Sequence, residues 1–307
     1  IILDGTLKDG MSGVHGLDTA FGVALSLDGN HAYVTGRDND AVSWYERNAT
    51  TGALTYGGVL KDGVGGVDGL NGARFVALSP DGNHAYIAGH DDNAVSWFER
   101  NASTGALTYG GMLKDGVNGV DGLNGALCVT LSTDGNHAYV TGEYDDAISW
   151  YERNASTGAL SYGGMLKDGV NGVDGLDTAI GVALSADGNH AYVTGFNDDT
   201  VSWHDINAST GALTFGGLLR DGVNGVDGLN GAEIVTLSAD GKHAYVTGKS
   251  DNALSWYERN ANTGALTYRG MLKDGVNGVH GLGYPFTVAI SEDGSHAYVT
   301  GKSDNAV

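Results

Sequence analysis

The fold is decided by a stretch that reads RFVALSPDGNHAYIAGHDDNAVSWFERNASTGALTYG, residues 74–110. Four short runs rich in β-branched and aromatic residues lie in it, at 74–79, 84–88, 94–100 and 106–110. Such runs favour β-strands, because branched and ring side chains pack well on a pleated surface. Pro80-Asp-Gly82 separates the first two runs, and Asp-Gly supplies the left-handed backbone that a tight hairpin needs. The stretch therefore predicts four consecutive antiparallel strands.

The same stretch recurs along the chain with a step of 53 residues. Its tripeptide His-Ala-Tyr begins at His31, His84, His137, His190, His243 and His296. No linker or shift in composition interrupts the series. Four short strands in a period of roughly 40–50 residues are typical of a propeller blade. We therefore predict an all-β, six-bladed β-propeller with four antiparallel strands per blade, in a single domain over residues 1–307.

The two ends of the chain predict how the propeller closes. Ile1 aligns with Leu54, where a fourth strand begins, so we expect the N-terminal strand to complete the last blade. A blade shared by the two ends leaves no long free edge. Six full units need 11 residues more than the 307 given, and the shortfall lies after Val307. We expect the whole protein to extend beyond that residue.

Composition excludes several classes of partner. The net charge of −21 and the pI of about 4.5 argue against nucleic acid and anionic membrane surfaces. No run approaches the roughly 18 apolar residues of a membrane span, so membrane insertion is not expected. Cys128 stands alone and forms no internal disulfide. The chain has no signal peptide and does not begin with Met, as in a processed mature protein or a fragment, and we expect an extracellular, secreted location.

Three motifs of the unit resemble repeats of the lactonase-like β-propeller family of bacteria. They are Ala-Leu-Ser-Pro-Asp-Gly-Asn-His-Ala-Tyr-Ile (77–87), Asp-Asn-Ala-Val-Ser-Trp-Phe (92–98) and Ser-Thr-Gly-Ala-Leu-Thr (103–108). The linking Lys-Asp-Gly-Val-x-Gly-Val-Asp-Gly-Leu is similar to repeats of less characterised members. The resemblance covers nearly the whole chain and implies the propeller fold. Members of that family often have seven blades, and no lactonase active site is carried over onto residues of this chain.

Acidic residues gather in the segments expected on one face of the propeller. The links between blades and between the second and third strands hold 22 of the 37 acids, so this face should be strongly negative. Paired aspartates recur in the links between blades: Asp62 and Asp68, Asp115 and Asp121, Asp168 and Asp174, Asp221 and Asp227. They suit Ca²⁺, which takes about six to eight oxygen ligands. The alternative is that they cap turns and are neutralised by neighbouring lysines such as Lys114.

Two positions differ from unit to unit while their surroundings barely change. The residue after the second strand reads Arg37, His90, Glu143, Phe196, Lys249 and Lys302. An early position of the first strand reads Phe21, Arg74, Leu127, Ile180, Glu233 and Phe286. A ligand on the propeller axis would break the repeat symmetry in this way, as would neutral drift. We predict ligand binding at the mouth of the central channel by Arg37, Arg74, His90, Glu143, Phe196, Glu233, Lys249 and Lys302.

A second candidate ligand site recurs in each blade. Its members are Trp44, Glu46, Arg47, Trp97, Glu99, Arg100, Trp150, Glu152, Arg153, Trp256, Glu258 and Arg259. Trp stacks on sugar faces while Glu and Arg bond hydroxyl groups, and six-bladed fucose-binding lectins place similar residues between blades. Strand alternation puts Trp44 with Val42 and Tyr45 with Ser43, which favours packing between blades instead. The fourth unit departs from the set and reads Trp203-His-Asp-Ile.

The recurring histidines and sequons favour structural roles. The six His-Ala-Tyr histidines lie too far apart in a ring to share a zinc ion, whose ligand bonds are about 2 Å long. We interpret them as residues of turns and strand ends. Asn48, Asn101, Asn154 and Asn207 open Asn-Ala-Ser/Thr sequons, which glycosylation or plain Asx turns would explain.

Two functions follow as hypotheses. The chain lacks the nucleophile-elbow, metalloprotease and phosphate-loop motifs, and we assign no catalytic residue. The first hypothesis is a non-enzymatic, multivalent binding or scaffold protein, lectin-like and binding a glycan. The alternative is a lactonase-like hydrolase whose site at the channel mouth includes Arg74, Glu143 and Glu233.

Overall fold

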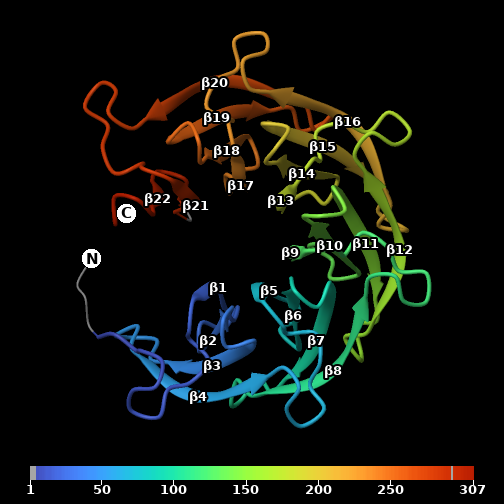
Figure 1. Cartoon of the computed structure of the whole chain (residues 1–307), viewed down its shortest axis with the longest axis vertical. Helices are drawn as coiled ribbons and strands as arrows, with labels where there is room; N and C mark the ends of the chain where they lie inside the picture. The colour runs from blue at the N-terminus through green and yellow to red at the C-terminus, as the bar shows by residue number, and fades with distance from the viewer. Residues whose placement is uncertain (1–4, 292) are drawn as a thin grey trace. The chain divides into compact units, whose positions relative to one another are not determined.

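The computed structural model of this chain describes residues 5–291 and 293–307. The regular elements in these ranges are β-strands, which form five four-stranded sheets and one two-stranded sheet. In each sheet the strands lie side by side in chain order (Figure 1). The predicted all-β class and the unit of four consecutive strands are therefore confirmed. None of the described residues forms a helix of the length and apolarity that a membrane crossing requires.

The strands recur with the period of the sequence. The first two sheets contain β1 (Ala20–Leu25), β2 (His31–Gly36), β3 (Ala41–Arg47), β4 (Leu54–Lys61), β5 (Ala73–Leu78), β6 (His84–Gly89), β7 (Ala94–Arg100) and β8 (Leu107–Lys114). The third and fourth contain β9 (Ala126–Leu131), β10 (His137–Gly142), β11 (Ala147–Arg153), β12 (Leu160–Lys167), β13 (Ala179–Leu184), β14 (His190–Gly195), β15 (Thr200–Ile206) and β16 (Leu213–Arg220). The last two contain β17 (Ala232–Leu237), β18 (His243–Gly248), β19 (Ala253–Arg259), β20 (Leu266–Lys273), β21 (Pro285–Ile290) and β22 (Ala297–Gly301).

The chain divides into two compact units. Unit 1 comprises the residues up to 140 together with 151–162, and unit 2 comprises 141–150 together with the residues from 163 onward. Within unit 1, β5 contacts both β1 and β9, and within unit 2, β17 contacts both β13 and β21. The first strands of successive sheets are thus neighbours inside each unit. This arrangement brings together residues that are one sequence period apart.

The second sheet illustrates why each repeat folds as it does. β6 and β7 pair in regular register from His84 opposite Glu99 to Gly89 opposite Ala94. The pairing of β7 with β8 is interrupted by a bulge beside Trp97, at Gly110. A Cβ atom at Gly110 would lie 2.6 Å from the Trp97 ring, so the glycine gives the indole room to lie against this strand. Bulges of this kind raise local twist and re-aim side chains.

The fourth strand is longer than its sequence pattern predicts. The last run of the second repeat ends at residue 110 in the sequence-based prediction, whereas β8 continues to Lys114. Leu113 and Lys114 pair with Val95 and Ala94 of β7, and this ladder extends the strand. Lys114, with which the predicted link between repeats begins, therefore belongs to the sheet.

The core lies between successive sheets. In unit 1, Tyr33 and Val42 of the first sheet share one buried cluster with Ile87 and Phe98 of the second. In unit 2, Tyr192 and Val201 share a cluster with Val246 and Tyr257 in the same way. The predicted packing of aromatic residues between repeats is confirmed for these pairs. Hydrophobic burial between sheets is the main stabilising contribution to such a fold.

The predicted closing strand at the N-terminus falls partly outside the described residues, which begin at residue 5. Residues 5–8 are described and hold no strand, and closure of the last repeat by the N-terminal strand stays a prediction. The residues with which they align, Gly58 to Lys61, are a strand because they pair with Trp44 to Ala41 of β3. No pairing of this kind is found for residues 5–8 within the described chain.

Candidate functional site

Arg153 fills a polar seat on the neighbouring sheet of unit 1. Its Nε donates to the hydroxyl of Tyr86 at 2.6 Å, and Nη2 lies 2.7 Å from Asp81 Oδ2 and 2.8 Å from His84 Nδ1. Its Nη1 donates to the carbonyl oxygen of Gly135 at 2.9 Å. All the donors of a guanidinium lie in one plane, and this seat uses that geometry fully. We call such an Asp-His-Tyr set an arginine seat.

Three arginine seats are filled in the described chain. Arg100 is hydrogen-bonded to Asp28, His31 and Tyr33. Arg153 is hydrogen-bonded to Asp81, His84 and Tyr86, and Arg259 to Asp187, His190 and Tyr192. Burial opposes ionisation of Asp81, but hydrogen bonds from Ser79 and Arg153 lower its pKa to about 2. Burial, followed by the charge of Arg153, lowers the pKa of His84, which keeps the ring neutral as an acceptor.

The per-blade candidates are thereby placed. Arg100, Arg153 and Arg259 are buried and hold successive sheets together, whereas Glu46, Glu99, Glu152 and Glu258 are exposed. Trp97 is buried. Trp44 and Trp150 are half-buried against paired glycines of their fourth strands, and Trp256 is half-buried against Gly270. Arg47 makes one hydrogen bond, from Nη1 to Gly29 at 2.9 Å. Within this set, Arg100, Arg153 and Arg259 are therefore buried between sheets, whereas the glutamates face solvent.

The fourth repeat breaks the pattern. His204 replaces the tyrosine, and it is fully buried, so desolvation lowers its pKa to about 3. Its Nε2 lies 3.0 Å from the Ser202 hydroxyl, while its Nδ1 has no hydrogen-bond partner among the described residues. Ile206 stands at the arginine position of this repeat. In unit 1 the hydroxyl of Tyr139, equivalent to the arginine-bound tyrosines, is likewise buried without a partner in the described chain.

The histidines and sequon asparagines have the structural roles predicted for them. His31, His84 and His190 begin the second strands of their sheets and are buried. Asn101 Oδ1 accepts hydrogen bonds from the backbone N–H groups of Ser103 at 2.9 Å and Thr104 at 3.1 Å, which forms an Asx turn. The same turn occurs at Asn48, Asn154, Asn207 and Asn260.

Glu233 of β17 is the centre of a different kind of cluster, in unit 2. Its side chain is almost fully buried, and its Oε1 lies 2.8 Å from Lys249 Nζ. The Lys249 ammonium stands over two rings, 5.0 Å from the centroid of Phe196 and 4.6 Å from that of Tyr284. A cation over aromatic faces is attracted by their negative quadrupole. The Glu233–Lys249 cluster therefore combines a buried carboxylate with a cation held in a fixed position.

The charges around Glu233 set its proton affinity. Burial raises the pKa of Glu233, the Lys249 ammonium counteracts this, and the negative charge of Glu143 adds to the rise. The Lys302 ammonium acts in the opposite direction from the loop after β22. Desolvation also acts on Lys249, but hydrogen bonding to Glu233 raises its pKa, which keeps it charged. A carboxylate of raised basicity beside a fixed cation is a combination suited to acid–base chemistry.

Backbone contacts position Glu233. The Thr194 hydroxyl donates to the carbonyl oxygen of Glu233 at 2.6 Å and accepts the N–H of Gly181 at 2.8 Å, which ties β14 to both β13 and β17. Tyr284 has a φ of 57°, the left-handed region. Repeats two, three and five carry Gly72, Gly125 and Gly231 at this position. Thr19 and Thr178 take the same left-handed φ in repeats one and four, so this conformation belongs to the repeat and strains any residue that has a side chain.

Unit 1 holds the remaining channel-mouth candidates. The Arg74 guanidinium lies 4.8 Å from the ring centroid of Phe21, and Phe21 packs edge to face on Phe75. His90 is buried, and its Nδ1 lies 2.6 Å from Asp91 Oδ1. Arg37 is half-exposed, 3.8 Å from Asp38. The structure thus brings together Glu143, Phe196, Glu233, Lys249 and Lys302 in unit 2, and Arg37, Arg74 and His90 lie in unit 1.

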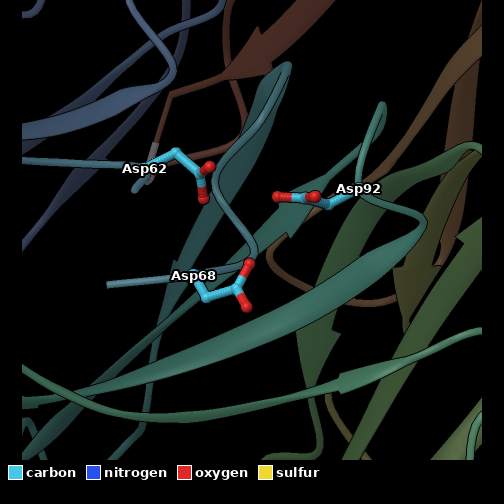
Figure 2. Close-up of side chains that lie close together, drawn as sticks. All are labelled: Asp62, Asp68 and Asp92. Atoms are coloured by element: carbon cyan, nitrogen blue, oxygen red, sulfur yellow. The ribbon is translucent and has the colours of Figure 1, made fainter. Parts of the chain in front are cut away.

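Three acidic triads lie inside the units, and each joins a predicted pair of aspartates to a third from a loop between second and third strands. Their members are Asp62, Asp68 and Asp92, then Asp168, Asp174 and Asp198, then Asp221, Asp227 and Asp251. Ligand oxygens within a triad lie within 4.8 Å of one another, a spacing that could hold a metal ion, and Figure 2 shows the first three carboxylates converging. Burial, with the other two charges, raises the pKa of Asp62.

Each triad also has structural partners. Asp62 accepts the N–H of Leu70 at 3.0 Å, and Lys114 lies 3.5 Å from Asp92. Arg220 lies 2.9 Å from Asp174, and Lys273 lies 2.9 Å from Asp251. Asp115 and Asp121 accept the N–H groups of Leu123 and Gly122 in unit 1. Turn capping and neutralisation by basic residues are thus both present, as the alternative interpretation predicts.

Sequence reasoning missed Tyr284 and the third member of each triad. The signal for Tyr284 was available, because it replaces a glycine of other repeats one residue before Pro285, one of only two prolines. The third aspartates Asp92, Asp198 and Asp251 come from loops that lie at least 21 residues from their partners in sequence. Only the sheet pairing brings them close.

Comparison with known proteins gives a family and a fold. The sequence model of the family described as lactonase, 7-bladed beta-propeller, matches residues 9–117, 63–171, 120–278 and 181–307. None of the curated proteins compared with the chain matches it significantly.

Solved structures resemble the chain at low identity. A protein from Bacteroides fragilis, described as "a putative 6-phosphogluconolactonase", has 20% identity and a TM-score of 0.72 over 92% of this chain and 77% of its own. The periplasmic gluconolactonase of Pseudomonas aeruginosa has 18% identity and a TM-score of 0.69 over 91% and 72%. A protein from Lactobacillus plantarum has 20% identity and a TM-score of 0.67 over 82% and 70%. At these identities the likeness shows the fold alone.

Proposed function

The chain belongs to the lactonase family of seven-bladed β-propellers, and from this premise we propose that it hydrolyses a lactone at the Glu233–Lys249 cluster. The observation that carries the proposal is the buried Glu233 carboxylate, with its raised pKa, held 2.8 Å from a lysine ammonium. These residues stand at two positions that differ among the repeats. Hydrolysis at a single active site needs chemically different groups close together, and this cluster supplies a carboxylate and an ammonium.

The chemistry follows from the charges. A water molecule attacks the lactone carbonyl carbon, and the Glu233 carboxylate accepts the proton that the water gives up. The oxygen of the former carbonyl becomes negative in the tetrahedral intermediate, where the ammonium of Lys249 or Lys302 stabilises it. The ring C–O bond then breaks, and the ring oxygen takes the proton that Glu233 accepted, so that it leaves as a hydroxyl group and the carboxylate is restored. The product is the open-chain hydroxy acid.

The test is turnover of a panel of five- and six-membered lactones, including sugar lactones, followed by the acid released. The wild-type protein should open at least one of them, and Glu233→Gln should reduce kcat/KM at least about 100-fold, because general-base catalysis contributes roughly 10²–10⁴. Glu258→Gln is the matched control, since Glu258 is an exposed carboxylate paired with Arg269. A wild-type protein inert to the whole panel would refute the proposal.

The pH profile gives a second check on the same residue. Glu233 accepts a proton only as the carboxylate, so kcat/KM should fall as the pH drops through its raised pKa. The acidic limb of the profile should therefore lie above pH 4.5, the ordinary pKa of a glutamate. An acidic limb at or below that value would contradict the assignment of Glu233 as the base.

We also propose that the acidic triads bind Ca²⁺. Three carboxylates with ligand oxygens within 4.8 Å offer the hard oxygen donors that this ion prefers. Millimolar Ca²⁺ should raise the melting temperature, a chelator should reverse the rise, and Asp68→Asn should diminish it, because Asp68 is the exposed member of its triad. An unchanged melting temperature would leave turn capping as the role of these residues.

The architecture at the finer level is likewise a proposal. We propose that the six repeats form six blades of one domain over residues 1–307. Calorimetry should then show one cooperative transition, with equal calorimetric and van't Hoff enthalpies. Two separate transitions would instead indicate that units 1 and 2 are independent domains.

Glycan binding and an extracellular location stay predictions. The exposed glutamates beside half-buried tryptophans are the features that still favour a sugar ligand. A glycan array combined with a haemagglutination assay tests the first prediction, and silence in both would remove it. Fractionation of the source cells tests the second.

A further inference from the structure

The third repeat carries the three side chains of an arginine seat, but no arginine stands at the position that fills the other seats. The three side chains belong to unit 1, and we call them the third-repeat seat: Asp134, His137 and Tyr139. In each filled seat the arginine lies 67 residues after the tyrosine. The residue 67 positions after Tyr139 is Ile206, whose side chain has no hydrogen-bond donor. The third and fourth repeats each have all four strands, so this difference arises within the chain and not at its end.

The hydroxyl of Tyr139 is the feature of this seat that points to a ligand. Tyr139 is fully buried, and its hydroxyl has no hydrogen-bond partner among the described residues. In the filled seats each corresponding hydroxyl accepts an arginine Nε–H at 2.6 Å and donates to the carbonyl oxygen of a hairpin glycine at 2.8 to 2.9 Å. Burial raises the pKa of Tyr139, which keeps the hydroxyl neutral. A donor that reaches its oxygen therefore gains a buried hydrogen bond without displacing one within the protein.

The acidic member of the third-repeat seat has the conformation of its equivalents in the filled seats. Asp134 Oδ1 accepts the Ser132 hydroxyl at 2.5 Å and the Asn136 N–H at 3.0 Å. Asp81 Oδ1 accepts the equivalent groups at the same distances. Burial opposes ionisation of Asp134, but the hydrogen bonds from Ser132 and Asn136 lower its pKa, so it is a carboxylate at neutral pH.

The second oxygen of Asp134 is the atom that takes the arginine in the filled seats. Here Oδ2 accepts the side-chain amide of the exposed Asn136 at 2.9 Å. In the second repeat the same atom of Asp81 lies 2.7 Å from Arg153 Nη2. A guanidinium can replace the neutral amide, because a hydrogen bond between two charged groups is about twice as strong as one between neutral groups.

Solvent reaches the third-repeat seat at its aspartate. Asp134 and Asn136 are exposed, whereas His137 and Tyr139 are buried. A ligand that bonds both the exposed carboxylate and the buried hydroxyl has to place a narrow, flat donor group in the seat. A guanidinium is such a group, and a small molecule can carry it there without a second protein surface having to fit against the hairpin.

We propose that the third-repeat seat binds a small molecule that carries an alkylguanidinium group and is about the size of free arginine. Its guanidinium would take the position that Arg153 takes against Asp81, His84 and Tyr86 in the second repeat. The acceptors suit a planar fork, whereas an ammonium is a point donor and does not reach all of them together. The inference goes beyond lactone hydrolysis, because Glu233 and Lys249 belong to unit 2 and form no part of this seat.

The test is a titration of the isotope-labelled full chain, followed by the amide resonances of β10. One ligand is ethylguanidinium chloride, which has the end of an arginine side chain, and the other is ethylammonium chloride at the same ionic strength. Ethylguanidinium should shift the resonances in a saturable way, and ethylammonium should bind at least about tenfold more weakly, because it makes fewer charge-assisted bonds. A wild-type chain that gives no saturable shift with ethylguanidinium, or that binds both ligands equally, would overturn the proposal.

Tyr139→Phe separates ligand binding from a structural role of the hydroxyl. It should weaken ethylguanidinium binding at least about tenfold, because the accepting oxygen is lost. Without ligand its melting temperature should equal or exceed that of the wild type, since no bond within the described chain is broken. Tyr86→Phe is the matched control: it should lower the melting temperature and leave ethylguanidinium binding unchanged, because Arg153 fills that seat.

Asp134→Asn is a second variant, at the exposed end of the seat. It should also weaken ethylguanidinium binding at least about tenfold, because a neutral amide replaces the carboxylate. Asp81→Asn, its matched control in a filled seat, should lower the melting temperature and leave ligand binding unchanged. Unaltered binding by both Tyr139→Phe and Asp134→Asn would place the ligand elsewhere and overturn the proposal.

Discussion

The filled arginine seats and the Glu233–Lys249 cluster both combine charged and aromatic residues, but they serve different purposes. Each seat combines Arg, Asp, His and Tyr, a set that suits catalysis, yet it occurs three times with the same four residue types in the same contacts. The Glu233–Lys249 pair occurs once, because no other repeat carries a glutamate at the position of Glu233. Both contain buried charge, but only the second has it at a place that the repeat symmetry does not dictate.

The comparison teaches how to assign roles in a repetitive protein. Charge that recurs in register with the backbone joins one sheet to the next. Charge that appears once, next to a strained residue such as Tyr284, has no such structural need. Chemical suitability alone would have selected the wrong residues.

The largest effect is expected from emptying a filled seat. Arg153→Ala should lower the free energy of unfolding by about 3–5 kcal/mol, because it leaves Asp81 and the buried Tyr86 hydroxyl without their partner. Chemical denaturation measures the loss. Arg47→Ala is the matched control, since Arg47 makes a single hydrogen bond and should cost less than about 1 kcal/mol. Equal losses in the two variants would show that the seats do not stabilise the fold.

A smaller effect is expected from repairing the fourth repeat. His204→Tyr should raise the free energy of unfolding by about 1–3 kcal/mol, because it removes a buried nitrogen that lacks a hydrogen-bond partner in the described chain. Tyr257, its equivalent, donates to Ser255 at 2.8 Å. The pKa of His204 is about 3 in the fold against an ordinary value of 6.5, so stability is full above pH 6.5 and declines as the pH falls toward 3.

The advantage of His204→Tyr should therefore grow as the pH is lowered from 6.5. Denaturation of both proteins at pH 7 and pH 5 measures the difference. An advantage that stays the same at both values would mean that His204 is not held neutral by its burial.

The smallest effect on stability is expected at Tyr284. Tyr284→Gly should raise the free energy of unfolding by about 1 kcal/mol, because glycine adopts a φ of 57° without steric cost. The same change should lower lactone turnover, since Lys249 loses one of its two rings. Tyr284→Phe keeps both strain and ring and serves as the control. A glycine variant with reduced stability would remove the argument that strain is stored here.

Much of the fold was predictable from residues such as those of the second repeat. Asp81-Gly82 and the alternating run at 84–88 predict a hairpin because local chemistry decides it. The extension of β8 to Lys114 was not predictable, because it depends on pairing with Ala94 across the sheet.

The candidate site was likewise predictable only in part. Comparing repeats selected Glu233 and Lys249 from the sequence, because differences among copies are visible without coordinates. Their ion pair and the aromatic rings around Lys249 depend on β17 lying between β13 and β21. The role of Arg100 and Arg153 was missed as well, since the Asp, His and Tyr partners of each lie 67 residues or more away in sequence.

A crossed comparison of two variants tests the central claim most directly. Lactone turnover and melting temperature are measured for Glu233→Gln and for Arg259→Ala, both in unit 2. We predict that Glu233→Gln loses turnover at least about 100-fold while its melting temperature stays within a few degrees of wild type. We predict that Arg259→Ala melts much earlier yet retains turnover per folded molecule. Full turnover by Glu233→Gln, or equal loss of turnover in both variants, would contradict the account.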